Sequence, residues 1–329
     1  MSSRARIKSA LPVLALRRNR QSSVSGFGDR VLYALCALAG LLATFVLVEI
    51  VYQVIHGASP SISRFGLGFI VHARWQPNFS SFGAASALFG TLVCSLTALV
   101  IATPLGIAIG LYLSMIAPGS VRRIVGPLVE MLAAIPSVIV GFWGVAVLAP
   151  FVAQHLEPFL HSVLGFIPIF GAPQTTGLSV FTAGLGLSLM ILPIIAALSR
   201  DLFLTVPEDL KDGAAALGST RWEIIRGVVL PTTASGVAAA TVLGLGRALG
   251  EAIAVLQMIG DGTGVHSSLF LPGTSLASRI ANEFESPESK LHIPSLYYLA
   301  LILLVIGLTT SAIARWIGRR FDVQRVLAQ

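Results

Sequence analysis

The chain has 329 residues, of which 55% are hydrophobic and only 11% are charged. Charged residues make up about a quarter of an ordinary soluble domain, so this composition excludes a soluble protein and makes the bilayer the solvent of most of the chain. The net charge of +7 does not indicate a nucleic-acid-binding protein, because the basic residues flank apolar stretches. The two cysteines, Cys36 and Cys94, lie inside apolar runs and predict neither a disulfide nor a metal site.

Six apolar stretches are long enough to cross the bilayer as helices, because about 20 residues span its hydrocarbon core. The predicted spans are residues 31–55, 85–115, 124–152, 177–199, 234–260 and 294–316. The Ala-Leu-Ala run at 37–39 has the look of a signal-peptide cleavage site. The long polar segment before the first span, and the continuation of that span to Ile55, favour an uncleaved helix. The sequence therefore predicts an all-α membrane protein of about six transmembrane helices.

Lys and Arg residues are distributed unevenly between the alternating loops. Seventeen lie in the two tails and the loops on one side, and four lie in the loops on the other side. Because positive residues are retained in the cytoplasm during insertion, both termini are predicted to be cytoplasmic. The expected regions are an Arg-rich N-terminal tail (1–29), a first transmembrane helix with an outer segment (30–84), a core transmembrane domain (85–316) containing a cytoplasmic loop (200–233), and a C-terminal tail (317–329).

The cytoplasmic loop has the signals of two short helices joined by an elbow. Thr205 is a candidate N-cap of the first helix, and Gly218 is expected to end it. Thr220 and Glu223 have the spacing of a capping box that starts the second helix, which Pro231 is expected to limit. An ordinary connection and a docking element both fit this pattern.

The same loop resembles the EAA loop of ABC-importer permeases, in which Glu-Ala-Ala is followed by a Gly and later by Leu-Pro. The matching positions are Asp212, Gly213, Ala214, Ala215, Gly218, Leu230 and Pro231. Asp212 stands in place of the Glu and Gly213 in place of the first Ala, and Gly213 weakens a helix by up to about 1 kcal/mol. The resemblance implies that the loop docks into a cleft of a cytoplasmic ATPase.

ATP hydrolysis itself is not predicted for this chain. A nucleotide-hydrolysing chain needs a Gly-rich phosphate loop that ends in Gly-Lys-Ser/Thr. The three lysines are Lys8, Lys211 and Lys290, and none of them follows a glycine. We therefore expect ATP and Mg²⁺ to bind a partner subunit, and we expect no cofactor or metal on this chain.

The fifth span contains two full charges, Arg247 and Glu251, within the run Gly-Leu-Gly-Arg-Ala-Leu-Gly-Glu. A charge at the bilayer centre costs roughly 2.5–3.5 kcal/mol, so such residues normally face protein or water. Four residues apart on one helix face, the two are predicted to be able to pair, and Gly246 and Gly250 would let another helix approach. A structural ion pair remains open beside an anion path, in which an oxyanion competes with Glu251 for the guanidinium group.

Glu130 is the third charged candidate for the substrate path, because it lies in the predicted third span shortly before Pro136. A proline bends or breaks a helix, which would place Glu130 near a flexible point. Snorkelling of the carboxylate, or a hydrogen bond to a freed backbone donor, is the favoured alternative.

Several segments together are similar to the PstC-type permeases of bacterial phosphate ABC importers. They are the runs at 244–251, 135–141 and 280–284, and the outer segment with Trp75, Pro77, Phe82 and Gly83. The resemblance implies a type I ABC-importer permease fold in the bacterial plasma membrane and a path for phosphate along Arg247 and Glu251. It also implies three kinds of partner: a PstA-type second permease, two copies of a PstB-type ATPase, and an extracytoplasmic PstS-type phosphate-binding protein.

Other functions are compatible with parts of the sequence. A permease for sulfate, molybdate or phosphonate would share the docking loop, because the binding protein sets much of the selectivity. A channel or secondary transporter would commonly show an inverted repeat, and no clear repeat is visible. A membrane enzyme is disfavoured because no nucleophile, base and orienting group form a known motif.

Overall fold

The computed structural model describes the backbone of residues 22–320 and the side chains of residues 28–316. The predicted N-terminal tail (1–29) and C-terminal tail (317–329) lie mostly outside these ranges. Six of the described helices are long and apolar enough to cross a membrane, which confirms the predicted number of spans. The described part of the chain contains no sheet, and a single antiparallel bridge joins Gln76 and Ser81. The fold is therefore all-α, as predicted.

The chain divides into two units, residues 1–56 and 57–329. The first unit is described only where it forms α2 (Ser22–Phe65), the helix that continues into the second unit. The side chains from Gly28 to Ile50 are all exposed. Since most of them are apolar, this surface needs lipid or another protein around it. The helical stretch with the length and composition of a span runs from Gly28 to Phe65, longer than the predicted 31–55.

The second unit is built around the pair α4 (Ala85–Leu111) and α9 (Val180–Leu204). Small residues let these helices pack closely: a Cβ on Gly106 would lie 2.9 Å from a methyl group of Ile195. The other long helices of this unit are α12 (Leu230–Gly250) and α15 (His292–Arg320), which pack against each other. The shorter helices are α3 (Gly68–Val71), α5 (Gly119–Leu132), α6 (Ser137–Trp143), α7 (Ala149–Phe151), α8 (Glu157–Leu164), α10 (Glu208–Ala216), α11 (Arg221–Ile224), α13 (Ile253–Ile259) and α14 (Leu276–Glu283).

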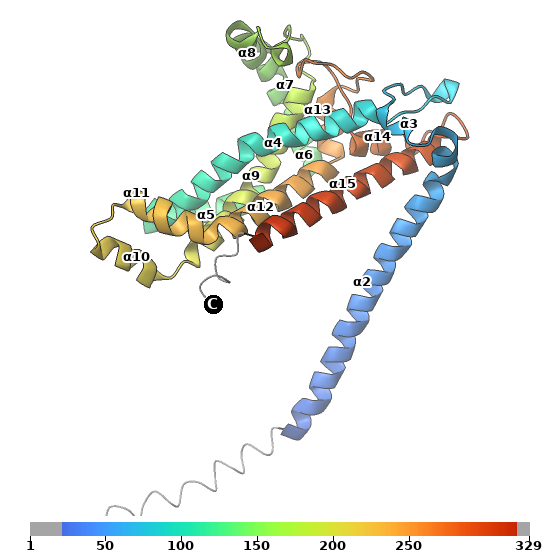
Figure 1. The fold of residues 1–329 in the computed structure, drawn as a ribbon. Helices are drawn as coiled ribbons and strands as arrows, with labels where there is room; N and C mark the ends of the chain where they lie inside the picture. Colours follow the sequence, from blue (N-terminus) through green and yellow to red (C-terminus); the bar gives the residue numbers. More distant parts are fainter. Residues whose placement is uncertain (1–21, 321–329) are drawn as a thin grey trace, which may run out of the picture. The chain divides into compact units, whose positions relative to one another are not determined.

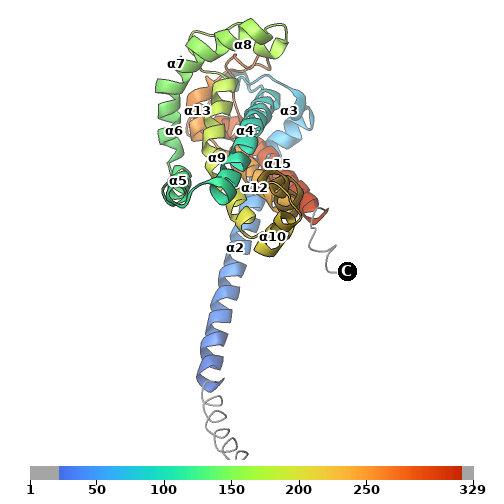
Figure 2. The same ribbon diagram turned by 90° about the vertical axis from the view of Figure 1, so that its left-hand side faces the viewer.

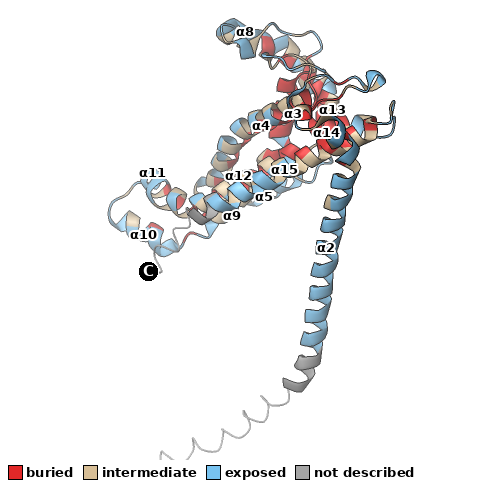
Figure 3. Cartoon of the chain, turned by 45° about the vertical axis from the view of Figure 1, so that its right-hand side comes forward, coloured by how far each residue is buried: buried red, intermediate tan, exposed pale blue. Residues whose placement is uncertain are grey.

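Buried residues gather where α13, α14 and the start of α15 meet, and between α4, α9 and α13 (Figure 3). The helices α10 and α11 project from one end of this unit, and α8 lies near its opposite end (Figure 1). Figure 2 shows the chain running from α5 through α6 and α7 to α8 along one side of the unit. The second unit therefore carries the predicted docking elbow at one end and an apolar core toward the other.

The predicted third span, 124–152, is wrong. The structure places α5 before a break at residues 133–136. The helix of membrane length begins after this break and runs from Ser137 to Leu164; it consists of α6, α7 and α8, which are joined by two π-helical turns. Pro136 causes the break, because it has no N–H for a helical hydrogen bond and its backbone is extended at ψ 135. The α5 helix is consequently a separate, short element with Arg122 and Arg123 in its first turns.

The predicted fifth span, 234–260, is also displaced, because the membrane-length helix runs from Arg221 to Gly250. Pro231 was expected to limit the preceding helix, yet the helix passes through it. A π-helical turn at Ile225–Val229 directly precedes α12, with Leu230 donating to the carbonyl of Ile225. This wider turn places Pro231 at the start of the next α-helical stretch, where its missing N–H is tolerated.

Candidate functional site

Arg247 lies three residues before the end of α12, and its side chain is exposed in the isolated chain. The helix ends at Gly250, and Glu251 has an extended backbone with φ −73 and ψ 120. The two residues therefore do not share a helix face, and the predicted pairing between them is not found. Among the described residues neither side chain has an ion-pair or hydrogen-bond partner. A guanidinium within a span is thus left without a counter-ion among the residues that the structure describes.

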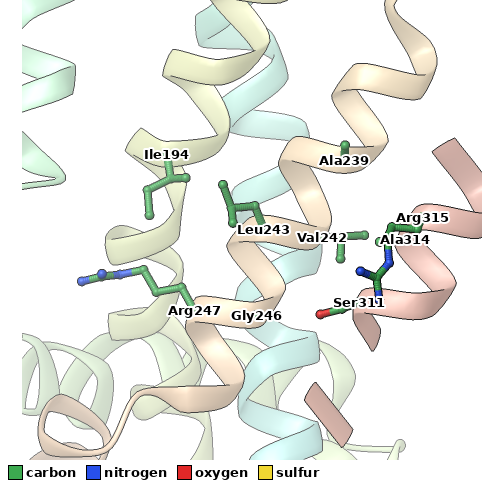
Figure 4. A pocket seen from close by; sticks show the side chains of 9 residues that line it. All are labelled: Ile194, Ala239, Val242, Leu243, Gly246, Arg247, Ser311, Ala314 and Arg315. Carbon is green, nitrogen blue, oxygen red and sulfur yellow. The ribbon is translucent and has the colours of Figure 1, made fainter. Parts of the chain in front are cut away.

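Two hollows lie beside this arginine. The first hollow has a volume of about 550 Å³ and lies beside α12 and α15. It is lined by Gly246, Arg247, Ser311 and Arg315 together with apolar residues. Figure 4 shows Ser311 and Arg315 on α15, and the Arg247 side chain directed away from them. The lining of the second hollow, of about 400 Å³, has Arg247 as its one charged residue.

The apolar wall of this second hollow comes from three helices and the turn between two of them. Its other lining residues are Leu132, Ala133, Ile135, Ile139, Val140, Trp143, Leu189, Met190 and Leu192. They belong to the end of α5, the turn after it, α6 and α9. Because this wall is apolar and offers no acid, an incoming oxyanion would be a suitable partner for the Arg247 guanidinium. We call this hollow the Arg247 pocket.

Glu130 lies on α5, outside the six helices of membrane length. Its Oε1 accepts a hydrogen bond of 2.8 Å from Nη1 of Arg200, in α9. The carboxylate therefore forms an ion pair. Neither the predicted role in a substrate path nor the alternative of snorkelling or a backbone hydrogen bond included such a pair. The pair joins residues 70 positions apart, so no local pattern could have indicated it. The role of Glu130 in a substrate path stays a prediction.

Gly246 and Gly250 were expected to admit another helix. In the isolated chain a Cβ on either glycine would meet no atom within 4 Å. Any close approach at these glycines must therefore come from outside the described residues of this chain.

The predicted elbow is present in α10, Gly218 and α11. Gly218 has φ +86, and the N–H groups of Gly218 and Ser219 donate to the carbonyls of Ala215 and Ala214. This pair of bonds is a Schellman motif and confirms the predicted end of the helix. Thr220 and Glu223 form the predicted capping box.

The start of the elbow differs from the prediction. The N-cap of α10 is Pro207, and Thr205 instead ends α9, where its hydroxyl donates to the carbonyl of Leu202. The residue before a proline is disfavoured in a helix, so the new helix begins only after Pro207.

The positions that match the EAA pattern separate into two groups. Asp212, Gly213, Ala215 and Gly218 are exposed at the tip of the elbow, with Ala214 half-buried among them, while Leu230 and Pro231 lie at the start of α12. Two large apolar residues missed by the pattern are exposed at the same tip: Leu217 is 89% exposed and Trp222 63%. Exposed apolar side chains on a capped, polar element are typical of a contact surface for another protein.

A polar cluster at the end of α14 and the start of α15, on the predicted outer side, was also missed. Glu283 accepts hydrogen bonds from Nε1 of Trp75 at 2.7 Å and from Nη1 of Arg279 at 3.0 Å, and it pairs with Nε2 of His292 at 2.7 Å. Burial lowers the pKa of the Arg279 guanidinium, and the carboxylates of Glu283 and Asp261 oppose this effect. The signal in the sequence was indirect, since Trp75 and Glu283 stand in two of the segments on which the family resemblance rests. We call these residues the outer cluster.

Comparison with known proteins supports one family along most of the chain. Residues 102–323 match the family model for binding-protein-dependent transport system inner membrane components. The phosphate transport system permease protein PstC of Mesorhizobium japonicum is 38% identical over 97% of this chain and 98% of that protein. The PstC of Pasteurella multocida is 40% identical over 93% of this chain and 98% of that protein.

The fold agrees with this assignment. A chain in the crystal structure of a bacterial alginate ABC transporter matches with a TM-score of 0.59 at 18% identity, over 89% of this chain and 97% of that chain. The predicted type I importer permease fold is thereby confirmed. The chain belongs to the family of binding-protein-dependent transport system inner membrane components, and within that family to the PstC-type permeases.

Proposed function

We propose that this chain is the permease subunit through which an ATP-driven importer moves inorganic phosphate across the bacterial plasma membrane. The observation that carries the proposal is Arg247, which lies in a helix of membrane length, lines the apolar Arg247 pocket and has no counter-ion among the described residues. The planar guanidinium offers paired N–H donors that match two oxygens of a phosphate ion. The relatives named PstC supply the substrate class.

In this mechanism Arg247 compensates the loss of hydration of the phosphate ion inside the membrane. A charge buried without a partner is costly, whereas a charge paired through hydrogen bonds is tolerated. Arg247 gains the same benefit, since its charge has no ion-pair partner among the described residues before the ion arrives. Glu251 does not pair with Arg247 in this structure, so it could favour release by competing for the guanidinium group only after a change of the backbone at the end of α12.

Energy reaches the site from a separate ATPase through the elbow. The coupling residues Asp212 to Gly218 and the exposed Leu217 and Trp222 would contact that subunit. From Arg221 the chain continues as one helix to Gly250, so Trp222 and Arg247 lie on the same continuous element, about 38 Å apart along its axis. A displacement of the elbow therefore moves Arg247 without passing through a flexible loop.

The proposed assembly contains a second, related permease, two copies of the ATPase that bind ATP and Mg²⁺, and an extracytoplasmic phosphate-binding protein. This chain would bind no cofactor, and both of its termini would lie in the cytoplasm. The exposed glycines Gly246 and Gly250 support close packing of the second permease against α12.

Reconstitution of the four components in vesicles tests the proposal, with uptake of labelled phosphate and sulfate followed with and without ATP. Replacing Arg247 with Gln removes charge-assisted hydrogen bonds that contribute about 1.5–3 kcal/mol, so we expect phosphate uptake to fall roughly 10- to 100-fold. The matched control is Arg123→Gln, the same substitution at an exposed arginine on α5.

Three outcomes would contradict the proposal. Preferential uptake of sulfate would overturn the substrate, and uptake without the ATPase would overturn the transporter class. Unchanged uptake by a correctly assembled Arg247→Gln variant would remove Arg247 from the path.

A further inference from the structure

Arg200 joins three helices near the elbow. It lies four residues before the end of α9, and its Nη1 donates to Oε1 of Glu130 on α5 at 2.8 Å. Its guanidinium also lies against Gly126 of α5, where a Cβ would come within 3.2 Å of Nη1. Its backbone nitrogen faces Gly110 of α4, where a Cβ would lie 3.0 Å away. The side chain is only 20% exposed, so its position is closely determined by these neighbours.

The helix that Arg200 holds also forms a wall of the Arg247 pocket. Leu132, the last residue of α5, lines the pocket together with Ala133 and Ile135 of the following turn. Pro136 interrupts the helix directly after these residues, so α5 can turn relative to α6 about that point. A change in the position of α5 therefore changes this wall.

The same arginine lies close in sequence to the coupling segment. Only Thr205, Val206 and Pro207 separate the end of α9 from α10, the first helix of the elbow. Val206 is buried with Phe203 and Val229 in one apolar cluster, which ties the end of α9 to the start of the helix leading to Arg247. These contacts provide a packed connection between the elbow and the last turns of α9.

From these contacts we infer that Arg200 is a positioning residue, whose ion pair with Glu130 couples the last turns of α9 to α5 and so sets the wall of the Arg247 pocket. The inference rests on the proposed function. It adds a second route from the elbow to the pocket, beside the continuous helix from Arg221 to Gly250. Because Glu130 is 57% exposed, we expect the pair to contribute little to the stability of the chain, as is usual for exposed ion pairs.

The test measures phosphate uptake and ATP hydrolysis together in the reconstituted four-component transporter. Arg200→Gln and Glu130→Gln each break the pair, and we expect each to lower the phosphate transported per ATP about tenfold. The exchange of the two charges, Arg200→Glu with Glu130→Arg, restores an ion pair and is expected to return the ratio to within about threefold of wild type. Such a rescue would show that the ion pair, and not either side chain alone, sets the ratio, while a loss of folding or assembly alone would not change the phosphate moved per ATP in the transporter that does assemble.

Arg123→Gln is the matched control, because it removes a positive charge from the exposed surface of α5 and should leave the ratio unchanged. Assembly of every variant is measured by co-purification with the ATPase. If the charge exchange fails to assemble, Glu130→Gln decides the question, since it alters a half-exposed side chain. A wild-type ratio in both single variants, or an assembled charge exchange that remains as impaired as they are, would overturn the inference. Failure of the wild-type transporter to take up phosphate would instead overturn the proposed function.

Discussion

Replacing Glu283 with Gln tests the outer cluster most directly, because this carboxylate has hydrogen-bond contacts with three other side chains. It neutralises Arg279, whose side chain is only 2% exposed and has one further acid nearby, Asp261, at 3.9 Å. Removing one partner of a buried ion pair commonly costs about 3–5 kcal/mol. Since Glu283 is itself 18% exposed and Asp261 remains, we expect a loss of about 2–3 kcal/mol.

The assay is thermal unfolding of the purified chain in detergent, where such a loss lowers the midpoint by roughly 3–5 °C for a chain of this length. Glu285→Gln is the matched control, because Glu285 is an exposed neighbour with no ion pair among the described residues. The reasoning is refuted if Glu283→Gln shifts the midpoint no more than the control does. In that case Arg279 would be stabilised by groups other than the carboxylate.

Three further substitutions probe packing and the elbow. Gly90→Ala would place a methyl group on the carbonyl oxygen of Thr274, and we expect folded protein recovered from membranes to fall several-fold, as quantified by size-exclusion chromatography. Gly213→Ala meets open space and should stabilise α10 by about 1 kcal/mol, leaving uptake unchanged, whereas reduced uptake would show that Gly213 itself contacts the ATPase. Leu217→Asp, at an 89% exposed position, should weaken co-purification of the ATPase without altering the thermal midpoint, and undiminished binding would exclude Leu217 from the contact.

The boundaries of the spans show how far local patterns reach. Apolar length predicted six membrane helices correctly, because each helix satisfies its own backbone hydrogen bonds and only its side chains must suit the lipid. The same criterion gave a predicted third span that includes the break at Pro136 and a predicted fifth span that extends past the helix end at Gly250. Hydrophobicity alone does not indicate where the backbone stops being helical. The π-helical turn at Ile225–Val229, before Pro231, was not predicted, because hydrophobicity does not distinguish a π-helical turn from an α-helical one.

The elbow was predictable because its signals are local. Gly218, with its positive φ, and the Thr220 and Glu223 capping box act within a few residues, so their sequence spacing fixes their geometry. The exposed Leu217 and Trp222 were not identified, because exposure depends on the packing of the whole chain.

The sequence by itself determined that this is a six-span membrane protein with a helix-glycine-helix elbow and an arginine within the fifth span, since composition, apolar length and capping motifs are properties of neighbouring residues. Only the tertiary structure decided which polar and charged side chains meet. Arg200 and Glu130 are 70 residues apart, and Trp75 and Glu283 are 208 residues apart. Arg247 and Glu251, four residues apart, do not pair, because the helix ends between them. Electrostatic partners are set by distance in space, which the folded helices alone establish.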